Sequence, residues 1–234
     1  SKEKGVKRQE MCKMVAEKIG KKAAFFDLDL TITERDSFRL FLKTYFKNIK
    51  NLIYVPYVFV CGVLRKLRII SLQQFKEQAL VGLKGKSSAE IHATGADFFE
   101  KHLIKTIRER AVRRIEEHRK NGDLIFIVSA SPDVYVHAVA RHLHCDGYIC
   151  SELEYDSDRF TGKLRGKDCI GAEKKNRLHD LADKNQIDLK RSSAYSDHEA
   201  DLKFLETAGT PIAVTPTTNL HQIAISRKWS IVCW

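Results

Sequence analysis

The sequence predicts an α/β fold, in which a Rossmann-like parallel sheet carries helices on both faces and a helical cap is inserted into this core. Short apolar runs alternate with helical patterns through the C-terminal two-thirds of the chain, which is typical of repeated strand–helix units. Segment 37–100 lacks this alternation and has a helical pattern throughout. The 234 residues, of which 43% are hydrophobic, are enough for one domain with an insertion.

The first predicted strand is the apolar run 23–26, which follows Lys21 and Lys22. A short, unbroken apolar run indicates an interior strand. Residues 1–22 carry eight Lys or Arg against three Glu, and we expect a basic N-terminal helix or lead-in there. We assign residues 23–36 and 101–234 to the core and residues 37–100 to the cap, which would fold over the C-terminal edge of the sheet.

The remaining elements follow in order. Leu103, Ile104, Ile107, Ala111 and Ile115 recur at helical spacing, and this predicted helix ends at Asn121-Gly122. A buried strand is predicted at 124–128. Ser131 and Pro132 suit the N-cap and the first position of a following helix.

The last third of the chain continues the same alternation. Residues 148–150 are typical of a strand, and residues 152–164 of a hairpin that turns at 156–158. A helix should follow Gly171, and a short strand should end at Tyr195. Gly209 would close the next helix, and the late strands are expected at 212–214 and 230–233.

The formal net charge of +11 favours anionic partners, such as phosphate esters, anionic lipid surfaces or nucleic acid. The basic residues are spread widely, without a recognition motif or interleaved aromatics, so we expect no nucleic-acid partner and keep a nucleic-acid-binding protein only as the non-enzyme alternative. Six scattered cysteines without a C-x-x-C pair indicate free thiols in a reducing compartment. No signal peptide is recognisable, although a leader lost before Ser1 stays open. We expect a cytoplasmic protein, with contact at the inner membrane surface as an alternative.

The most informative residues are Asp27 and Asp29, two positions apart at the end of the first predicted strand. Open α/β sheets bind ligands at this carboxyl edge. Two such close carboxylates repel each other unless a cation or a shared proton intervenes. A phosphoryl-transfer site needs this pair, since one carboxylate attacks, the other handles the proton, and Mg²⁺ offsets the charge.

Three further features occur at strand ends or helix starts. Ser129 follows strand 124–128, where a hydroxyl and backbone N–H groups could hold a phosphate. Lys174, early in the helix after Gly171, could supply a cation to phosphoryl oxygens. Asp197 follows the strand that ends at Tyr195, and Asp201 lies four residues later. Each feature alone has a structural explanation, but the four in this order indicate one catalytic site.

With these motifs the chain resembles the haloacid dehalogenase-like superfamily over about residues 23–233, in its phosphoserine-phosphatase-like branch. The matching segments are Phe-Phe-Asp-Leu-Asp-x-Thr at 25–31, Val-Ser-Ala-Ser-Pro at 128–132, Thr-Gly-Lys-Leu at 161–164, Cys-Ile-Gly-Ala-Glu-Lys at 169–174 and Tyr-Ser-Asp at 195–197. The resemblance implies a Mg²⁺-dependent phosphatase that forms an aspartyl-phosphate.

The resemblance also implies residue roles. Asp27 would be the nucleophile, and Asp29 would protonate the leaving oxygen and then activate water. The Mg²⁺ ligands would be Asp27, the Asp29 backbone carbonyl and Asp197, with Asp201 holding the metal shell in place. The phosphate would be bound by Ser129, the Ala130 N–H and Lys174.

Two positions depart from the pattern of this branch. Leu30 stands where Gly or Ser is usual, so a larger side chain could narrow the entry or alter the cap hinge. His198 replaces the Ser of the usual Gly-Asp-Ser motif, and we expect it to be a surface or supporting histidine without a catalytic role. A separate cluster, His142, His144 and Cys145, lies at the end of the predicted helix that follows Pro132. We expect these histidines to stabilise the helix C-terminus electrostatically and not to bind a metal.

The substrate stays open between small and lipid phosphate esters. Asp36, nine positions after Asp27, could bind a substrate ammonium, as in phosphoserine or histidinol phosphate. The apolar stretch 52–64 is too short to span a bilayer, and we expect it to pack inside the cap. The alternative is a membrane-facing surface, with Arg39, Lys43 and Arg65 meeting the headgroup of phosphatidylglycerophosphate or lysophosphatidate. The oligomeric state is not predicted.

Overall fold

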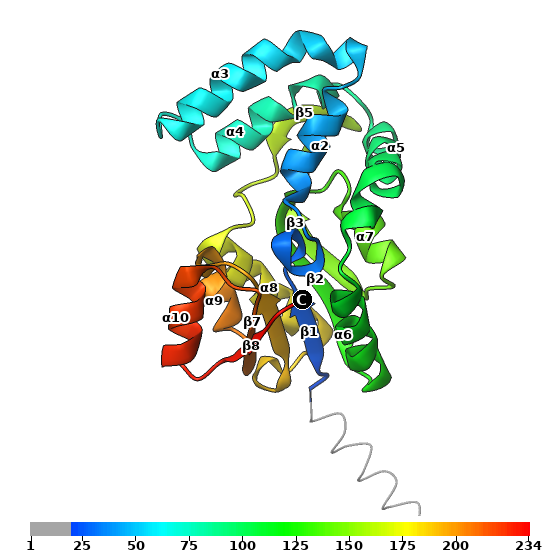
Figure 1. The fold of residues 1–234 in the computed structure, drawn as a ribbon. Coiled ribbons are helices and arrows are strands. Elements are labelled where there is room, and N and C mark those ends of the chain that lie inside the picture. The colour runs from blue at the N-terminus through cyan, green and yellow to red at the C-terminus, as the bar shows by residue number, and fades with distance from the viewer. Residues whose placement is uncertain (1–19) are drawn as a thin grey trace, which may run out of the picture.

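The computed structural model describes residues 20–234, so the predicted basic lead-in lies, except for its last three residues, outside the described part of the chain. The remaining chain forms a sheet with helices on both faces. A mostly helical lobe lies beyond the carboxyl ends of the strands (Figure 1). The predicted α/β fold is confirmed. The proposed boundaries of the cap at 37 and 100 stay a prediction.

Six parallel strands form the sheet in the order β3-β2-β1-β6-β7-β8. Their bounds are β1 (Ala23–Phe26), β2 (Leu124–Pro132), β3 (Gly147–Ser151), β6 (Ser193–Ser196), β7 (Thr210–Val214) and β8 (Ser230–Val232). The central strand β1 pairs with β2 on one side and with β6 on the other. The strand order reverses direction at β1, and the carboxyl end of such a strand is where α/β sheets form their ligand sites.

Alternate residues of β1 contribute to two hydrophobic cores, one on each face of the sheet. Ala24 and Phe26 pack with α6 (Glu109–Lys120) and α7 (Val136–His142). Ala23 and Phe25 pack with α8 (Gly171–Asn185), α9 (Leu202–Leu205) and α10 (Thr218–Ser226). Both faces of the strand are therefore covered, and its last residue leads directly into the buried Asp27.

The lobe beyond the sheet contains α2 (Ser37–Tyr45), α3 (Val55–Lys66), α4 (Leu72–Ala79) and α5 (Ser88–Phe98), with single turns at Ile49–Tyr54 and Val81–Leu83. Capping boxes start α4 at Ser71 and α5 at Ser87. The antiparallel hairpin of β4 (Leu153–Asp156) and β5 (Arg159–Leu164) joins this lobe from the C-terminal half of the chain, and the Leu164 N–H donates to Glu77 on α4.

The predicted helix from Leu103 to Asn121 begins too early in the sequence. The helical path of α5 continues through Phe99–Leu103 and Ile104–Thr106, and α6 starts only at Glu109. Between them Ile107 is extended, because this segment bonds to the chain after Asp29. The Glu34 N–H donates to the Thr106 carbonyl at 2.8 Å, and the Arg108 N–H donates to the Ile32 carbonyl at 2.9 Å.

The expected helix start at Ser131 and Pro132 is also wrong. Strand β2 runs through both residues, Pro132 pairs with Ser151, and α7 begins only at Val136. The Ser131 hydroxyl donates to Asp29 instead of capping a helix. The end of β2 is therefore held by side chains of the site.

Candidate active site

The centre of the site is a buried ion triplet at the carboxyl end of β1. Lys174, in the first turn of α8, lies with Nζ 2.6 Å from Asp27 Oδ1 and 2.6 Å from Asp201 Oδ2. The Lys174 side chain is only 1% exposed. A buried ammonium group is tolerated only when it is paired, and here the two aspartates are its partners. The fold thereby joins three residues that lie far apart in the sequence.

Burial and like charges set the protonation of these groups. Burial raises the pKa of Asp27 well above its ordinary value; Lys174 opposes this shift, and Asp201, Asp29 and Asp197 add to it. Burial also disfavours the Lys174 ammonium, but Asp201 and Asp27 outweigh that effect and raise its pKa. Burial raises the pKa of Asp197 to about 6. The four aspartates therefore share one negative field that a single lysine offsets only in part.

Asp29 is held by the start of α2 and by the end of β2. Its Oδ1 accepts the Ser37 N–H at 2.5 Å, and its Oδ2 accepts the Ser131 hydroxyl at 2.7 Å. Burial raises the pKa of Asp29, while the hydrogen bonds from Ser37 lower it. The net effect is a raised pKa, which favours the protonated form of Asp29 that a general acid needs.

Ser37, Ser131 and Tyr135 form a hydroxyl network around Asp29 that our sequence reasoning missed. The Tyr135 hydroxyl lies 3.1 Å from Ser131 Oγ, and the Ser37 hydroxyl lies 3.0 Å from the Tyr135 oxygen. All three side chains are buried. The sequence placed Ser131 in the matching segment 128–132 and Ser37 directly after Asp36, but no local pattern connected the three hydroxyl groups.

Two of the predicted phosphate ligands, Ser129 and Ala130, lie near the end of β2. Ser129 is fully buried, and its Oγ accepts the Ser131 N–H at 3.0 Å. The carbonyl of Ala130 accepts Lys76 Nζ at 2.6 Å and the Ser151 hydroxyl at 2.9 Å. These bonds fix the backbone beside Asp29, and the predicted phosphate contacts of Ser129 and Ala130 stay predictions.

Strand β6 positions the other acids. Asp197 directly follows β6 and accepts the Thr31 hydroxyl at 3.5 Å. The Ser196 hydroxyl donates to Asp201 Oδ2 at 2.7 Å. The site therefore gathers Asp27, Asp29, Asp197 and Asp201, whose oxygens are the donors that Mg²⁺ prefers. With one buried lysine among these four aspartates, the residues fit a divalent cation.

A second buried ion pair also went unpredicted. Lys76 of α4 lies 2.7 Å from Asp168, and the two side chains are 5% and 3% exposed. The Ser151 hydroxyl also donates to Asp168. Since Lys76 bonds to the Ala130 carbonyl as well, this pair ties α4 to the end of β2, which carries Ser129 and Ser131.

Asp36 and Arg39 lie at the start of α2. Asp36 accepts the Arg39 N–H at 2.8 Å and forms an ion pair with its Nε at 3.2 Å. The charge of Asp36 contributes to raising the pKa of Asp29, so Asp36 lies close enough to Asp29 to act on it electrostatically. The Arg39 side chain is 87% exposed and is directed mainly into solvent.

The two departures from the family pattern have clear places. Leu30 adopts a left-handed backbone conformation with φ 59°, which L-residues with a Cβ adopt only at a cost and which glycine adopts freely. His198 accepts the Ala200 N–H through Nδ1 at 3.0 Å, so it caps the turn that carries Asp201. His142 and His144 are exposed, and within residues 20–234 they do not converge with Cys145 on a metal site.

The apolar stretch 52–64 does not pack inside the cap, so that expectation is wrong. Most of its large side chains are exposed, Ile53 and Phe59 by 77% and 72%. We call these residues, together with the exposed apolar residues next to them in the sequence, the α3 apolar face. Its members are Ile49, Leu52, Ile53, Val55, Tyr57, Phe59, Val60, Val63, Leu67 and Ile69. No described helix is both long enough and apolar enough to cross a membrane.

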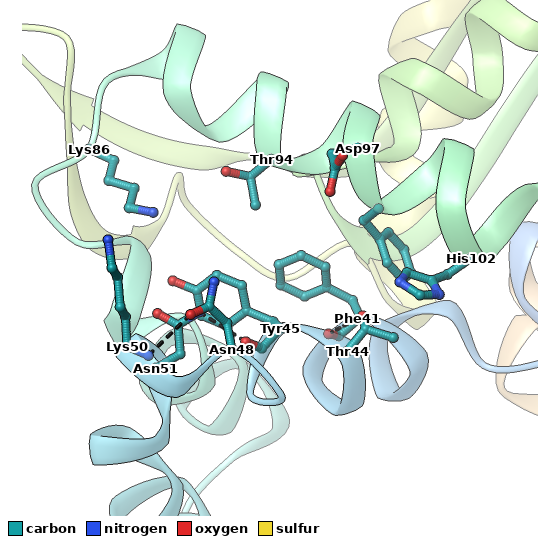
Figure 2. A pocket seen from close by; sticks show the side chains of 11 residues that line it. Phe41, Thr44, Tyr45, Asn48, Lys50, Asn51, Lys86, Thr94, Asp97 and His102 are labelled. Carbon is teal, nitrogen blue, oxygen red and sulfur yellow. Dashed lines mark hydrogen bonds between the residues drawn. The ribbon is translucent and has the colours of Figure 1, made fainter.

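A pocket of about 290 Å³ lies between α2, the turn at 48–51 and α5. Figure 2 shows Lys50 and Lys86 on one side of it and Asp97 and His102 on the other. The residues that line it include none of the four aspartates or Lys174. This hollow is therefore separate from the catalytic site.

Comparison with known proteins supports the same assignment. A family model of haloacid dehalogenase-like hydrolases matches residues 24–206. The chain is 28% identical to phosphoserine phosphatase SerB1 of Mycobacterium tuberculosis, over 89% of this chain and 70% of that protein. It is 32% identical to protein CicA of Caulobacter vibrioides, over 78% of this chain and 81% of that protein.

Solved structures share the fold. A protein of unknown function from Bordetella pertussis has a TM-score of 0.81 at 25% identity, with 91% of this chain and 98% of that chain covered. A substrate-bound phosphoserine phosphatase has a TM-score of 0.62 at 19% identity, with 91% and 92% covered. The chain therefore belongs to the haloacid dehalogenase-like hydrolases, and within them it is similar to phosphoserine phosphatases in sequence and fold.

Proposed function

We propose that this protein is a Mg²⁺-dependent phosphomonoesterase that works through an aspartyl-phosphate on Asp27. The observation that carries the proposal is the buried contact of Lys174 with both Asp27 and Asp201. A lysine in this position can neutralise phosphoryl oxygens while it orients the attacking carboxylate. Asp29, held separately by Ser37 and Ser131, is free for proton transfer.

The reaction has two steps. A carboxylate oxygen of Asp27 attacks phosphorus, the bond from phosphorus to the ester oxygen breaks, and Asp29 gives its proton to the leaving oxygen. Water then attacks the aspartyl-phosphate while Asp29 takes one of its protons, which releases phosphate and restores both acids. Lys174, Ser129 and the Ala130 N–H would hold the phosphoryl oxygens.

The residues that would hold Mg²⁺ are Asp27, Asp197 and the Asp29 backbone carbonyl, with Asp201 holding the metal shell in place. When bound, the ion would offset the negative charge that burial concentrates here and would draw charge from the phosphoryl oxygens. Asp201 would then position Lys174 as well as the metal shell, since its Oδ2 contacts the Lys174 ammonium.

Phosphate release from a panel of monoesters in the presence of Mg²⁺ tests this proposal. Replacing Asp27 with Asn should remove turnover and the phosphorylated protein adduct, while circular dichroism stays unchanged. Lys174→Gln should lower activity by at least about 100-fold, and its exposed neighbour Lys175 provides the matched control Lys175→Gln. An Asp27→Asn protein with near-normal turnover would refute the mechanism.

We further propose that the substrate is a phosphate ester of a lipid, reached at an anionic membrane surface. The α3 apolar face supports this substrate, because large exposed apolar patches on a soluble protein usually mark an interaction site. Basic residues flank it at Lys47, Lys50, Arg65, Lys66 and Arg68, and such residues attract anionic headgroups. The competing substrate class is an amino-bearing small ester, which Asp36 would recognise.

Vesicle binding and substrate preference separate these two classes. With phosphatidylglycerol vesicles, the unaltered protein should sediment and Phe59→Ser should not, since Phe59 is 72% exposed. Ile225→Ser on α10, which alters a side chain 60% exposed away from this face, should sediment normally. If lysophosphatidate and phosphatidylglycerophosphate are poor substrates and phosphoserine or histidinol phosphate is preferred, the lipid proposal fails while the mechanism on Asp27 stands.

A further inference from the structure

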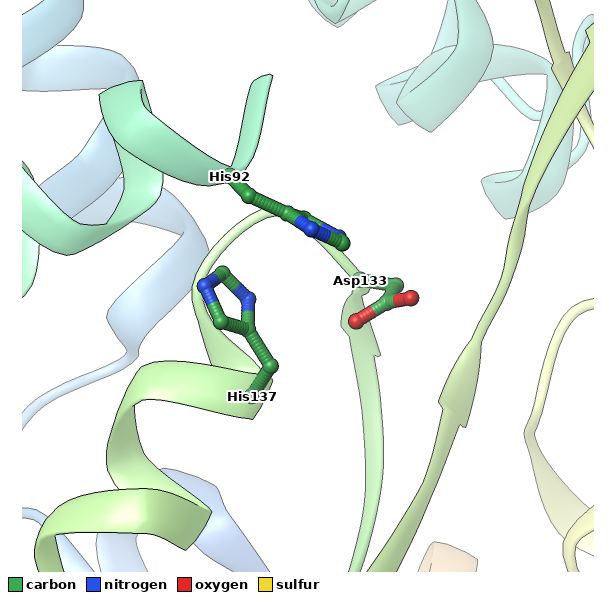
Figure 3. Close-up of side chains that lie close together, drawn as sticks. All are labelled: His92, Asp133 and His137. Atoms are coloured by element: carbon green, nitrogen blue, oxygen red, sulfur yellow. The ribbon is translucent and has the colours of Figure 1, made fainter. Parts of the chain in front are cut away.

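A second group of metal-ligating side chains lies outside the catalytic site. His92 comes from α5, Asp133 from the turn after β2, and His137 from the first turn of α7. One ligand atom from each residue lies within 4.8 Å of the other two. Figure 3 shows the three side chains converging between the cap helix and the core helix. None of them has a role in the mechanism proposed above.

Two polar atoms of this group are buried without a hydrogen-bond partner among the described residues. They are Oδ1 of Asp133 and Nδ1 of His137. Buried polar atoms in folded proteins are nearly always paired, so each exception needs an explanation. A bound cation would give both atoms a partner at once.

The protonation of the group suits a metal. Burial lowers the pKa of His137 to about 4, with smaller effects from His92 and Arg141. The ring is therefore neutral near pH 7, which is the form that binds metals. The ring centroids of His92 and His137 are 4.3 Å apart. Burial raises the pKa of Asp133 to about 6, and a cation would favour its ionised form.

The backbone holds the three residues in place before any ion binds. Gly95 lies one helical turn after His92 on α5, and a Cβ atom built there would lie 1.6 Å from the Val134 carbonyl oxygen. Only a glycine allows this direct contact between α5 and the turn at 133–135. The contact holds the α5 backbone against the turn that carries Asp133, so packing supplies part of the ordering that binding requires.

We propose that His92, Asp133 and His137 bind one divalent transition-metal ion of the Zn²⁺ class. Two imidazole nitrogens and one carboxylate oxygen suit Zn²⁺, which would keep a fourth position for water. Mg²⁺ prefers all-oxygen ligands and would stay at the aspartates. The ion would tie α5 of the cap to the turn after β2, and Ser131, which contacts Asp29, lies at the end of β2 two residues before Asp133.

Metal titration of the untagged, full-length, metal-free protein tests the site. With Mg²⁺ in excess, calorimetry should find about one Zn²⁺ per chain, and Co²⁺ should give the visible spectrum of a tetrahedral, nitrogen-ligated ion. His92→Ala and His137→Ala should each weaken Zn²⁺ binding by at least about 100-fold. At 100 times the dissociation constant, Zn²⁺ should raise Tm by about 5–10 °C in the unaltered protein.

His221→Ala is the matched control, because it removes an exposed histidine of α10 and should leave Zn²⁺ binding unchanged. His92→Ala keeps the test decisive if His137→Ala fails to fold, since it alters a half-buried side chain on a helix. Unchanged Zn²⁺ affinity in a folded His92→Ala protein would overturn the proposal. Loss of the ion in Asp197→Asn instead of the histidine variants would also overturn it, because the ion would then belong to the catalytic site.

Discussion

The buried pair of Lys76 and Asp168 offers a sharp test of how the cap is held on the core. Replacing Lys76 with Met keeps most of the side-chain volume but leaves Asp168 with a buried charge and one hydroxyl partner, Ser151. Breaking a buried ion pair from one side costs about 3–5 kcal/mol. Because Asp168 keeps the Ser151 bond and can take up a proton, we expect the lower value, about 3 kcal/mol.

A double-mutant cycle in urea measures this cost. Lys76→Met and Asp168→Asn should each lower the free energy of unfolding, and the double variant should lose about 2 kcal/mol less than the sum of the two single losses. The matched control is Lys101→Met, which breaks an ion pair with Asp97 whose side chains are 64% and 59% exposed. That change should cost under about 1 kcal/mol.

The same variants report on catalysis. Lys76 also donates to the Ala130 carbonyl, so Lys76→Met should lower kcat for any accepted ester even under conditions where the protein stays folded. A coupling energy below about 1 kcal/mol, which is the size found for surface pairs, would refute the view that this pair fastens the cap to the end of β2 beside Asp29.

Two further predictions concern packing and pH. Gly95→Ala should destabilise the protein by about 1–3 kcal/mol or more in thermal unfolding, because the new Cβ meets the Val134 carbonyl. The control is Gly62→Ala on α3, where the nearest neighbour of the new Cβ would be 3.8 Å away. That change should increase the free energy of unfolding by up to about 1 kcal/mol. In EDTA, the raised pKa of Asp197, about 6 against an ordinary 3.8, means that the folded state binds its proton more tightly. This contribution is therefore fully present below pH 3.8 and lost as the pH rises to about 6, a decrease of about 3 kcal/mol. Asp197→Asn should remove this part of the pH dependence of urea-derived stability between pH 4 and 7, while Asp27, Asp29 and Asp133, whose pKa values are also raised, keep theirs. An equal slope in both proteins would contradict the assignment.

The alternation of strands and helices, the insertion after the first strand and the order of the acids and Lys174 could all be predicted from the amino-acid sequence. These features depend on local patterns, because a buried strand needs an unbroken apolar run and a strand end needs a turn. The helix boundaries near Leu103 and Ser131 were wrong for the opposite reason. Bonds to residues far away in the chain keep Ile107 and Pro132 extended, and local propensity does not record such bonds.

Which side chains meet depends on how the helices and strands pack, and the sequence patterns did not contain that information. Lys76 and Asp168 are 92 positions apart, and neither lies in a motif that we recognised, so their pairing follows from how α4 packs on the core. The histidines of α5 and α7 meet because Gly95 allows close backbone contact. The apolar stretch 52–64 was predicted to be buried because its residues are hydrophobic, without knowledge of the elements that would pack against it. It lies exposed because burial depends on what packs against a helix, and the residues of α3 alone do not specify that.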